Sequence, residues 1–480
     1  MVRKLFFIVI VISFLLVGCQ RNSLTPINVD GSRDLANITP LPPIEIKQEN
    51  IPTAIQIEYV EIVPTEIPPT PEPSATQVIL PEISVSPPTP TSIPVPQAYG
   101  PGEFPPGINP LTGLPVSDPA SLQIPPALVS VTNFPVTARP QAGLDFSPYV
   151  FELYIGEGMS RFLVLFYGDY PSSNPRPENG SGIQELHASG NLSEIPSASM
   201  PADSAVIGPI RSGRLPYESA RMLYNGFLVM ASAFSGVSKN LDAYSNVYGS
   251  DAGDINSALI KVTNLEKLAQ ANVQRLGGAA MNVTRFDPTP PIGGKPAQSL
   301  WFMYSYLNQI FWRYDPASGA YNRYQNSDVT PEGFVEATDR LNEQPLTYEN
   351  VVILFTNHRM CTETAFDLDL LYVKRAPALL FRDGQVYDIY WTTKNEDYER
   401  TTGRLRPIRF VDAEGNAFPM KPGQTWVHFV PMYTRYWETV DSEVLYDLQN
   451  KDQPGSGFWA MRFYPSMFIF DQSVCDRIKG

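Results

Sequence analysis

The chain has 480 residues, of which 43% are hydrophobic, and this is enough apolar material for a sizeable core in more than one domain. Its formal net charge of −14 at pH 7 repels the phosphate backbone of nucleic acids. We therefore expect no nucleic-acid partner.

The N-terminal segment has the pattern of a bacterial lipoprotein signal. Arg3 and Lys4 precede an apolar run over residues 5–16, and Gly18 stands before Cys19. This leader is too short for a spanning helix. We expect residues 1–18 to be removed and Cys19 to carry acyl chains, palmitate among them. The alternatives are an uncleaved N-terminal anchor and a leader with a chance cysteine.

Lipidation of Cys19 would hold the protein at the cell membrane with its body on the extracytoplasmic side. Each buried methylene contributes about 0.8 kcal/mol, and one acyl chain alone gives marginal binding, so several chains on one cysteine are needed for a stable anchor. The membrane, reached through this N-terminal lipid, is thus the first expected partner.

Residues 19–108 read as a disordered spacer rich in Pro, Thr and Ser. Runs such as 67–73 and 86–92 alternate proline with small polar residues, and such a stretch cannot bury enough apolar surface to offset its ordering entropy. Polyproline-like chain rises about 3.1 Å per residue, which allows a reach on the order of 100–200 Å. A Pro-rich ligand for a partner domain is the alternative interpretation.

An α/β N-terminal domain is expected over residues 109–290. Its apolar, β-rich segments predict strands over 127–133, 149–155, 161–168, 205–210 and 227–232. Pro216 opens a helix that runs through Tyr224, and Asn264 caps a second helix that Gly277 stops. The order of strand, loop, helix and strand favours a mixed sheet covered by helices.

A strand-rich C-terminal domain is expected over residues 291–480. The proline- and glycine-rich stretch 287–294 breaks both the helical and the strand period just before it. Strands are predicted over 310–315, 321–325, 351–356, 378–381, 385–391 and 424–430, the first pair as a hairpin. The whole body is therefore predicted to be α+β.

Aromatic residues are dense around this hairpin, and two interpretations of them stay open. They could stack on sugar rings, or they could pack across the strands of the hairpin itself. The residues are Trp301, Trp312, Tyr314, Tyr321 and Tyr324.

Four ordered motifs connect the chain to a known family. Residues 109–115 (Asn-Pro-Leu-Thr-Gly-Leu-Pro), 138–144, 160–166 and 207–214 (Ile-Gly-Pro-Ile-Arg-Ser-Gly-Arg) resemble the YerB-like family of bacterial lipoproteins, and Gly423-Gln-Thr-Trp426 resembles its closing β segment. The resemblance implies an envelope lipoprotein with a two-part body of unknown function, and it names no reaction.

The chain departs from the family pattern where catalysis would be placed. Glu157 stands between two glycines, one position from where relatives carry a glutamate, and residues 230–234 lack the histidine that relatives often show. A mechanism that needs that histidine would have no base here.

The best candidate site is a set of arginines and one serine next to glycine or proline. Arginine on such turns suits a bidentate grip on carboxylate or phosphate groups, for example those of a cell-wall polymer. The alternative is that these arginines pair with Asp145, Glu152 and Glu157 to hold loops in place. The residues of the set are Arg139, Arg161, Arg211, Ser212 and Arg214.

Glu157 and Ser212 each allow a catalytic and a structural interpretation. Glu157 could act with Glu152 as the acid/base pair of a cell-wall polymer hydrolase with an arginine-lined subsite. Ser212 lacks the Gly-x-Ser-x-Gly pattern and reads as a capping residue more than as a nucleophile. The sequence leaves open whether the protein is an enzyme.

Cysteine and histidine usage adds one structural expectation. After lipidation of Cys19, only Cys361 and Cys475 remain, and they are either a disulfide or two buried thiols. Cysteine catalysis by Cys361 with His358 is a weaker alternative. The histidines lie far apart without paired-ligand spacing, so we expect no metal and no other cofactor.

Together these features predict a lipid-anchored, extracytoplasmic envelope protein. Its leading interpretation is a non-enzymatic component that binds an anionic cell-wall ligand or an envelope protein. The competing interpretation is the hydrolase that uses Glu157.

Overall fold

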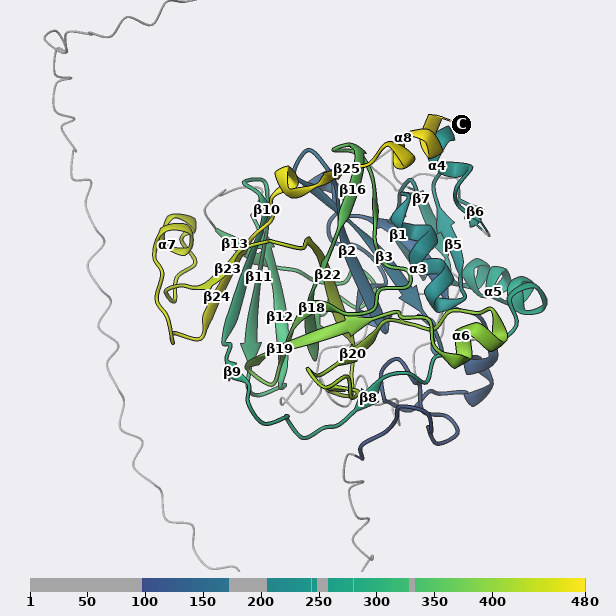
Figure 1. Cartoon of the computed structure of the whole chain (residues 1–480), viewed down its shortest axis with the longest axis horizontal. Coiled ribbons are helices and arrows are strands. Elements are labelled where there is room, and N and C mark those ends of the chain that lie inside the picture. Colours follow the sequence, from purple (N-terminus) through teal and green to yellow (C-terminus); the bar gives the residue numbers. More distant parts are fainter. Residues whose placement is uncertain are drawn as a thin grey trace, which may run out of the picture. The chain divides into compact units, whose positions relative to one another are not determined.

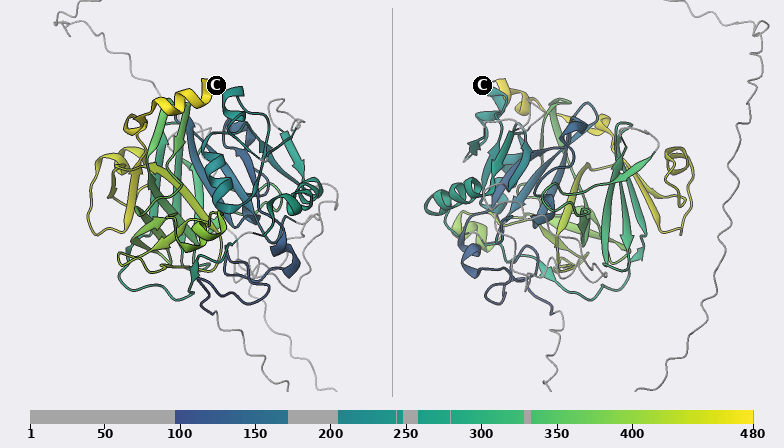
Figure 2. Two further views of the ribbon diagram at one scale, coloured as in Figure 1. Left: turned by 45° about the vertical axis from the view of Figure 1, so that its right-hand side comes forward. Right: turned by 180° about the vertical axis from the view of Figure 1, so that it is seen from behind.

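The computed structural model describes residues 97–171, 205–242, 244–247, 258–278, 280–327 and 333–479. All of these belong to one compact unit (Figures 1 and 2). The expected leader, Cys19 and most of the spacer lie outside the described residues. The body already includes Tyr99, upstream of the start expected at residue 109, because Tyr99 exchanges two backbone hydrogen bonds with Phe286, at 2.9 and 2.8 Å.

A thirteen-stranded mixed sheet forms the centre of this unit. Its inner strands are mostly apolar and are buried on both faces; all seven residues of β15 are buried. The strands are β1 (Ala127–Thr132), β2 (Tyr149–Gly156), β3 (Met159–Phe166), β4 (Val206–Ile210), β5 (Phe227–Met230), β6 (Tyr244–Asn246), β7 (Ala258–Lys261), β9 (Lys295–Pro296), β15 (Asn350–Thr356), β18 (Ala376–Arg382), β19 (Gln385–Thr392), β20 (Arg409–Val411) and β22 (Thr425–Pro431).

Strands from both halves of the sequence alternate in this sheet. Strand β22 pairs in parallel with β15 on one side and with β2 on the other, so that Val427 lies between Val352 and Phe151. The α+β class and the mixed sheet are thus confirmed. The division of the chain at residue 290 stays a prediction, and one sheet runs across it.

A second, seven-stranded sheet packs on one face of the main sheet, beside β22 (Figure 1). Trp312 meets Trp426 with ring centroids 5.5 Å apart, and Phe302 stacks on His428 at 4.5 Å. The strands are β10 (Ser299–Ser305), β11 (Asn308–Asp315), β12 (Ala320–Asn326), β13 (Phe334–Glu336), β14 (Thr347–Tyr348), β23 (Tyr436–Glu438) and β24 (Phe458–Arg462).

Two smaller ladders complete the strands of the described part of the chain. One joins β16 (His358–Thr362), β17 (Ala365–Leu368) and β25 (Ile469–Phe470), and the other joins β8 (Arg285–Phe286) and β21 (Pro419–Met420).

The helices are short apart from α5. Helix α3 packs on the face of the main sheet opposite the second sheet, where Tyr224 meets Phe151 at 5.5 Å. The helices are α3 (Pro216–Tyr224), α4 (Ser235–Ser238), α5 (Val262–Leu276), α6 (Asp397–Thr402), α7 (Leu445–Asn450) and α8 (Gln472–Lys479). None of them is long and apolar enough to cross a membrane, as far as the described residues go.

The expected boundaries of α3 are confirmed, whereas the expected cap of α5 is wrong. Helix α5 begins at Val262, so Asn264 lies within its first turn, and Lys261 occupies the cap position without a side-chain hydrogen bond. The buried Val262 follows directly on β7 and donates its backbone N–H to Ala205. Tertiary packing therefore starts this helix.

The hairpin predicted around Gly319 is confirmed as β11 and β12, with Tyr314 opposite Tyr321. Asp383 and Gly384 both have positive φ, 53° and 68°, and connect β18 to β19 in a two-residue turn. Of the aromatic residues around the hairpin, Trp301, Trp312 and Tyr321 are buried, and Tyr314 and Tyr324 are partly buried. This is the cross-strand packing alternative.

Cys361 and Cys475 form a disulfide with a Cα–Cα distance of 4.8 Å. It joins β16 to α8 across 114 residues of sequence. Closing a loop of this length stabilises the fold by about 4–5 kcal/mol in the chain-entropy picture.

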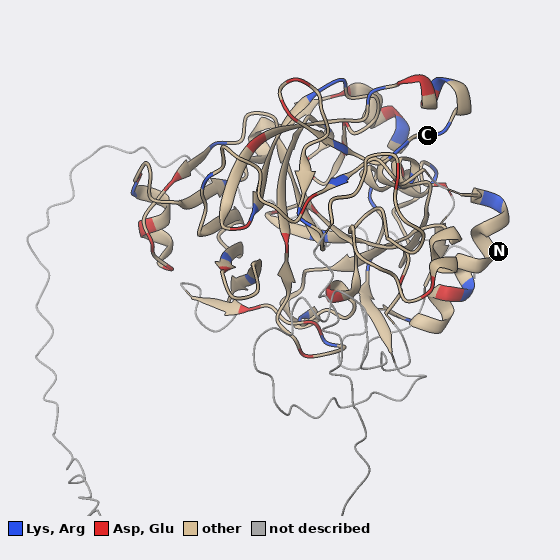
Figure 3. Cartoon of the chain, turned by 90° about the horizontal axis from the view of Figure 1, so that it is seen from below, with Lys and Arg blue, Asp and Glu red and all other residues tan. Residues whose placement is uncertain are grey.

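Charged residues of both signs are interspersed over the body (Figure 3).

Candidate anion-binding site

Strand β3 presents two neighbouring polar residues to opposite faces of the main sheet. Successive side chains of a strand alternate between faces. The Ser160 hydroxyl donates to Glu152 Oε1 at 2.6 Å, on the face covered by the second sheet. The Arg161 side chain points to the other face, where it reaches Ser212. The two faces therefore have separate polar chemistry.

Arg161 and Arg214 converge on Ser212. Arg161 Nη1 donates to the Ser212 carbonyl oxygen at 2.8 Å and to its Oγ at 3.1 Å. Arg214 Nη1 donates to the same Oγ, also at 3.1 Å. One serine hydroxyl thus accepts from two guanidinium groups.

The chain after β4 is fixed between two strands, which positions Ser212. The Arg211 N–H donates to the Ser130 carbonyl of β1 at 2.9 Å, and the Arg211 carbonyl accepts from Ala231, just after β5, at 3.0 Å. Because β1 and β5 are parallel, this segment enters between their carboxyl ends. The space outside the carboxyl ends of two parallel strands is a common ligand site in α/β sheets.

Tyr217 closes the cluster from the first turn of α3. Its hydroxyl lies 3.2 Å from Ser130 Oγ, and the side chain is fully buried. Leu215 occupies the cap position of α3 without a side-chain hydrogen bond, so Ser212 does not cap the helix as its sequence context indicated. Its hydroxyl serves the two arginines.

Burial and like charge disfavour the positive charges of this cluster. Burial lowers the pKa of Arg161 to about 9, with a further contribution from the charges of Arg214 and Arg211 and an opposing one from Tyr217. Burial, followed by the charge of Arg211, also lowers the pKa of Arg214, against the opposing effect of Tyr217. A bound anion would relieve this repulsion.

Within the described chain, no carboxylate forms an ion pair with Arg161 or Arg214. The Nε atoms of both side chains are buried without a hydrogen-bond partner there. Glu152 instead binds Arg323, with Nη2 3.5 Å from Oε2. The alternative in which acidic residues hold these arginines therefore does not describe Arg161 and Arg214.

Arg139 and Glu157 lie apart from Ser212 in the contacts that the structure describes. Arg139 Nε donates to Asn133 Oδ1 at 3.2 Å, and its guanidinium lies 4.9 Å from the Phe134 ring. Glu157 is exposed at the turn between β2 and β3, where its backbone N–H donates to Glu363 at 3.3 Å. Of the predicted set, the structure brings together Arg161, Arg211, Ser212 and Arg214.

The opposite face holds a buried network around Glu152. Trp426 Nε1 donates to Glu152 Oε2 at 3.0 Å, and Trp312 Nε1 donates to His428 Nε2 at 3.0 Å. His428 Nδ1 lies 3.3 Å from the Tyr304 hydroxyl. The Arg323 guanidinium lies 4.6 Å from the Trp426 ring. These side chains tie the second sheet to the main sheet.

Comparison with known proteins finds two family models that match the chain. The N-terminal domain model of the protein family of unknown function DUF3048 matches residues 111–176, and its C-terminal domain model matches residues 302–427. The chain carries both DUF3048 domains. The resemblance to YerB-like proteins is thereby confirmed.

One curated relative is the Bacillus subtilis (strain 168) protein named "Putative lipoprotein YerB". It is 23% identical over 340 residues, which cover 67% of this chain and 86% of that protein. The crystal structure of the Bacillus subtilis YerB protein aligns with a TM-score of 0.48 at 21% identity, over 67% of this chain and 96% of that one.

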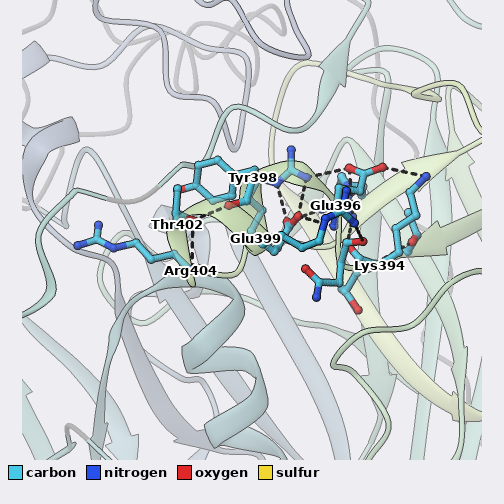
Figure 4. A network of polar contacts seen from close by, with 12 residues as sticks. Lys394, Glu396, Tyr398, Glu399, Thr402 and Arg404 are labelled. Carbon is cyan, nitrogen blue, oxygen red and sulfur yellow. Dashed lines mark hydrogen bonds and ion pairs between the residues drawn. The ribbon is translucent and has the colours of Figure 1, made fainter.

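The sequence did not single out a cavity whose lining comes from the C-terminal DUF3048 match, between residues 374 and 417, and from residues 101–102 and 280–283. It has a volume of about 710 Å³ and lies beside α6. Arg406 Nε donates to Glu399 at 2.7 Å, and Lys394 Nζ lies 2.8 Å from Glu396 (Figure 4). Glu396 at the N-cap of α6 and Glu399 in its first turn form a capping box, which is a local sequence pattern for part of this arrangement.

Catalysis at His358 and Cys361 is excluded by the contacts of both residues. Cys361 is bonded to Cys475, and burial lowers the pKa of His358 to about 3, although its contact with the Thr356 carbonyl and the charge of Asp369 oppose this. No group of three or more His, Cys, Asp or Glu side chains suited to a metal ion occurs in the described parts of the two domains.

Proposed function

We propose that this protein is a lipid-anchored, extracytoplasmic component of the bacterial cell envelope whose body binds an anionic ligand. The binding residues are Arg161, Ser212 and Arg214, with Arg211 contributing charge. The ligand is a carboxylate- or phosphate-bearing part of the cell wall. The proposal assigns no catalytic step to the protein.

The anchored location is supported by the leader and by a relative. Residues 1–18 and Cys19 have the lipoprotein pattern, and the related Bacillus subtilis protein is named as a lipoprotein. Palmitate labelling and membrane fractionation test this part. We expect labelled, membrane-bound protein from the parent chain and neither property from Cys19→Ser. An unlabelled parent chain recovered in the cytosol would overturn it.

The observation that carries the binding proposal is the meeting of a buried guanidinium group, that of Arg161, and a partly buried one, that of Arg214, at one serine. Buried charges are ordinarily paired, because an unpaired buried ion loses its hydration. Arg161 is 6% exposed, yet its hydrogen-bond acceptors among the described residues are only the uncharged oxygens of Ser212. An oxyanion between the two arginines would supply the missing charge and accept charge-assisted hydrogen bonds.

Binding is tested with purified cell-wall fragments and the double variant Arg161→Gln/Arg214→Gln. The control is Arg435→Gln/Arg462→Gln, which removes the same charge from two arginines outside the cluster. We expect the cluster variant to lose capture of anionic fragments and the control to keep it. Equal capture by both variants, each shown to be folded by circular dichroism, would exclude the cluster as the binding site.

The hydrolase alternative is tested separately by Glu157→Gln. No observed contact brings Glu157 to the cluster, and the side chain lies at an exposed turn. We expect this variant to capture wall fragments as the parent does and neither protein to release soluble sugars. Release by the parent that disappears in Glu157→Gln would establish the hydrolase instead.

A further inference from the structure

The cavity beside α6 is a second positively charged site, which shares no residue with the Arg161–Arg214 cluster. Its walls come from segments that are far apart in the sequence, including residues 101–102, 280–283, 374–375 and 392–398. Five cations line it: Lys374, Arg375, Lys394, Arg406 and Arg409. In a chain with a net charge of −14, such a local excess calls for a physical explanation.

Two glutamates account for only part of this charge. Arg406 reaches Glu399 at 2.7 Å and Glu396 at 2.8 Å, and these bonds are short. Arg409 reaches the same carboxylates at 3.3 and 3.7 Å. With two negative charges against five positive ones, three positive charges remain.

Lys374 and Arg375 line the cavity without an ion pair in the described chain, whereas Lys394 forms one with Glu396 at 2.8 Å. Lys374 is exposed and makes no hydrogen bond or ion pair within the described chain. Arg375 donates to the Ala413 carbonyl at 2.7 Å and lies 4.1 Å from the Tyr390 ring. Lys394 shares Glu396 with Arg406. These cations are thus available to a ligand.

Deeper in the cavity, Arg409 supplies a buried guanidinium. It is 9% exposed, and burial followed by the neighbouring charge of Arg406 lowers its pKa, against the pull of Glu396 and Glu399. Its Nη2 donates to the Lys394 carbonyl at 2.8 Å, which fixes its orientation. A cation held in place inside the cavity is preorganised for an anion.

Apolar side chains provide the other half of the lining. Phe410 and Val411 are 4% and 8% exposed and belong to β20, and Tyr398 lies under the Arg406 guanidinium with its ring centroid 5.0 Å away. Ligand sites typically combine such apolar surface with a few oriented polar groups. The lining therefore suits a molecule with one apolar face and one charged end.

We propose that the cavity beside α6 binds an organic phosphate that carries a ring. Cations approach from residues 374–375, from residue 394 and from residues 406–409, so they surround a ligand from several sides. This arrangement fits a tetrahedral phosphate better than a planar carboxylate, and lysine and arginine together are suited to phosphate. The ring lies against Phe410, Val411 and Tyr398.

The test is calorimetric titration of the full chain with phenyl phosphate at low salt. Inorganic phosphate, benzoate and benzyl alcohol serve as comparison ligands, since each lacks the ring, the phosphate or the charge. The test variant is Lys374→Gln/Lys394→Gln, which removes two exposed cations. The control variant is Lys267→Gln/Lys479→Gln, which removes two exposed lysines elsewhere.

We expect phenyl phosphate to bind the parent and the control with equal affinity. We expect its affinity for the test variant to be lower by a factor of about ten. The variant Arg161→Gln/Arg214→Gln is expected to bind it as the parent does, which separates this site from the proposed function. Absence of binding to the parent, or equal binding to test and control variants, would overturn the site. Equal affinity for inorganic phosphate would overturn the ring contact, and tighter binding of benzoate would overturn the phosphate.

Discussion

Two arginine environments on opposite faces of the same strands differ in what surrounds the charge. Arg323, on β12 of the second sheet, is buried between the two sheets, where it meets Glu152 and lies over the rings of Trp426 and Phe162, at 4.6 and 5.4 Å. Arg161 is also buried, but its neighbours are a serine, a tyrosine and two further arginines. One charge is matched inside the protein, and the other is not.

The difference separates a structural role from a binding role. A matched buried pair rigidifies its surroundings, and removing one partner leaves an uncompensated charge. A buried cation without a carboxylate costs folding free energy and gains most from an external anion. Of four expected effects, ordered from the largest to the smallest, those at Arg323 and at Arg161 test this contrast directly.

The largest effect is expected at the Glu152–Arg323 pair. Either Glu152→Gln or Arg323→Met should lower the free energy of unfolding by about 3–5 kcal/mol, because each leaves one buried partner unmatched. Urea denaturation measures this. The double variant should lose less than the sum of the two singles, since both charges are then gone. Strict additivity of the two effects would contradict a direct pair.

The same network should make the fold sensitive to acid. Burial, followed by the charge of Arg323, lowers the pKa of His428 well below its usual value, and Trp312 donates to its unprotonated Nε2. Unfolded histidine binds a proton near pH 6.5, so the unfolded state takes up more protons and stability falls as the pH drops below about 6.5.

The slope of this loss is at most about 1.4 kcal/mol per pH unit for each histidine. His358 adds to it down to about pH 3, where its folded form begins to accept a proton. Urea midpoints between pH 7 and pH 4 measure the slope. His428→Gln should be less stable at pH 7 and have a flatter profile, whereas an unchanged slope would contradict the role of His428.

A smaller effect is expected at Glu399 beside α6. Although burial alone raises its pKa, hydrogen bonds from Arg406 and from backbone N–H groups lower it to about 2. A carboxylate with a lowered pKa stabilises the fold above its unfolded value near 4.5, and this contribution is lost as the pH falls towards 2.

Glu399→Gln keeps the capping hydrogen bond that glutamine also provides, so we expect a loss of only about 1 kcal/mol at pH 7. Comparison of parent and variant from pH 6 to pH 2 should show their stabilities converging. A difference that stayed constant over this range would show that the charge of Glu399 is unimportant.

The smallest effect on stability is expected at Arg161. Arg161→Gln removes a buried charge that Arg214 and Arg211 repel, and this gain offsets the lost bonds to Ser212. We expect the free energy of unfolding to stay within about 1 kcal/mol of the parent value. A loss as large as that of Arg323→Met would break the contrast between the two environments.

Local features of the fold were predictable because local sequence sets them. Pro216 starts α3, Gly319 and Asp383-Gly384 turn their hairpins, and the apolar runs of β1, β2 and β15 form strands as expected. Strand β10 was not predicted, since Ser299–Ser305 is apolar without alternation and has no turn signal of its own.

Long-range pairing could not be predicted in the same way. Nothing near Glu152 in sequence shows that Arg323, Trp426 and His428 meet it, because these contacts depend on strand order across the whole sheet. The cluster was predictable in part because Arg211, Ser212 and Arg214 share one loop. Only Arg161 comes from a distant part of the sequence. The cavity beside α6 needs five separate segments, and only its capping pattern is local.

The position of β22 between β2 and β15 makes the two halves of the chain depend on each other. Without the second half of the chain, β2 would become a sheet border with unpaired backbone groups at Tyr149–Glu152, and without the first half, β22 would become one. Exposed borders of this kind recruit other chains and promote aggregation. Each half therefore shields the other, and a gene encoding only one of them should yield an insoluble product.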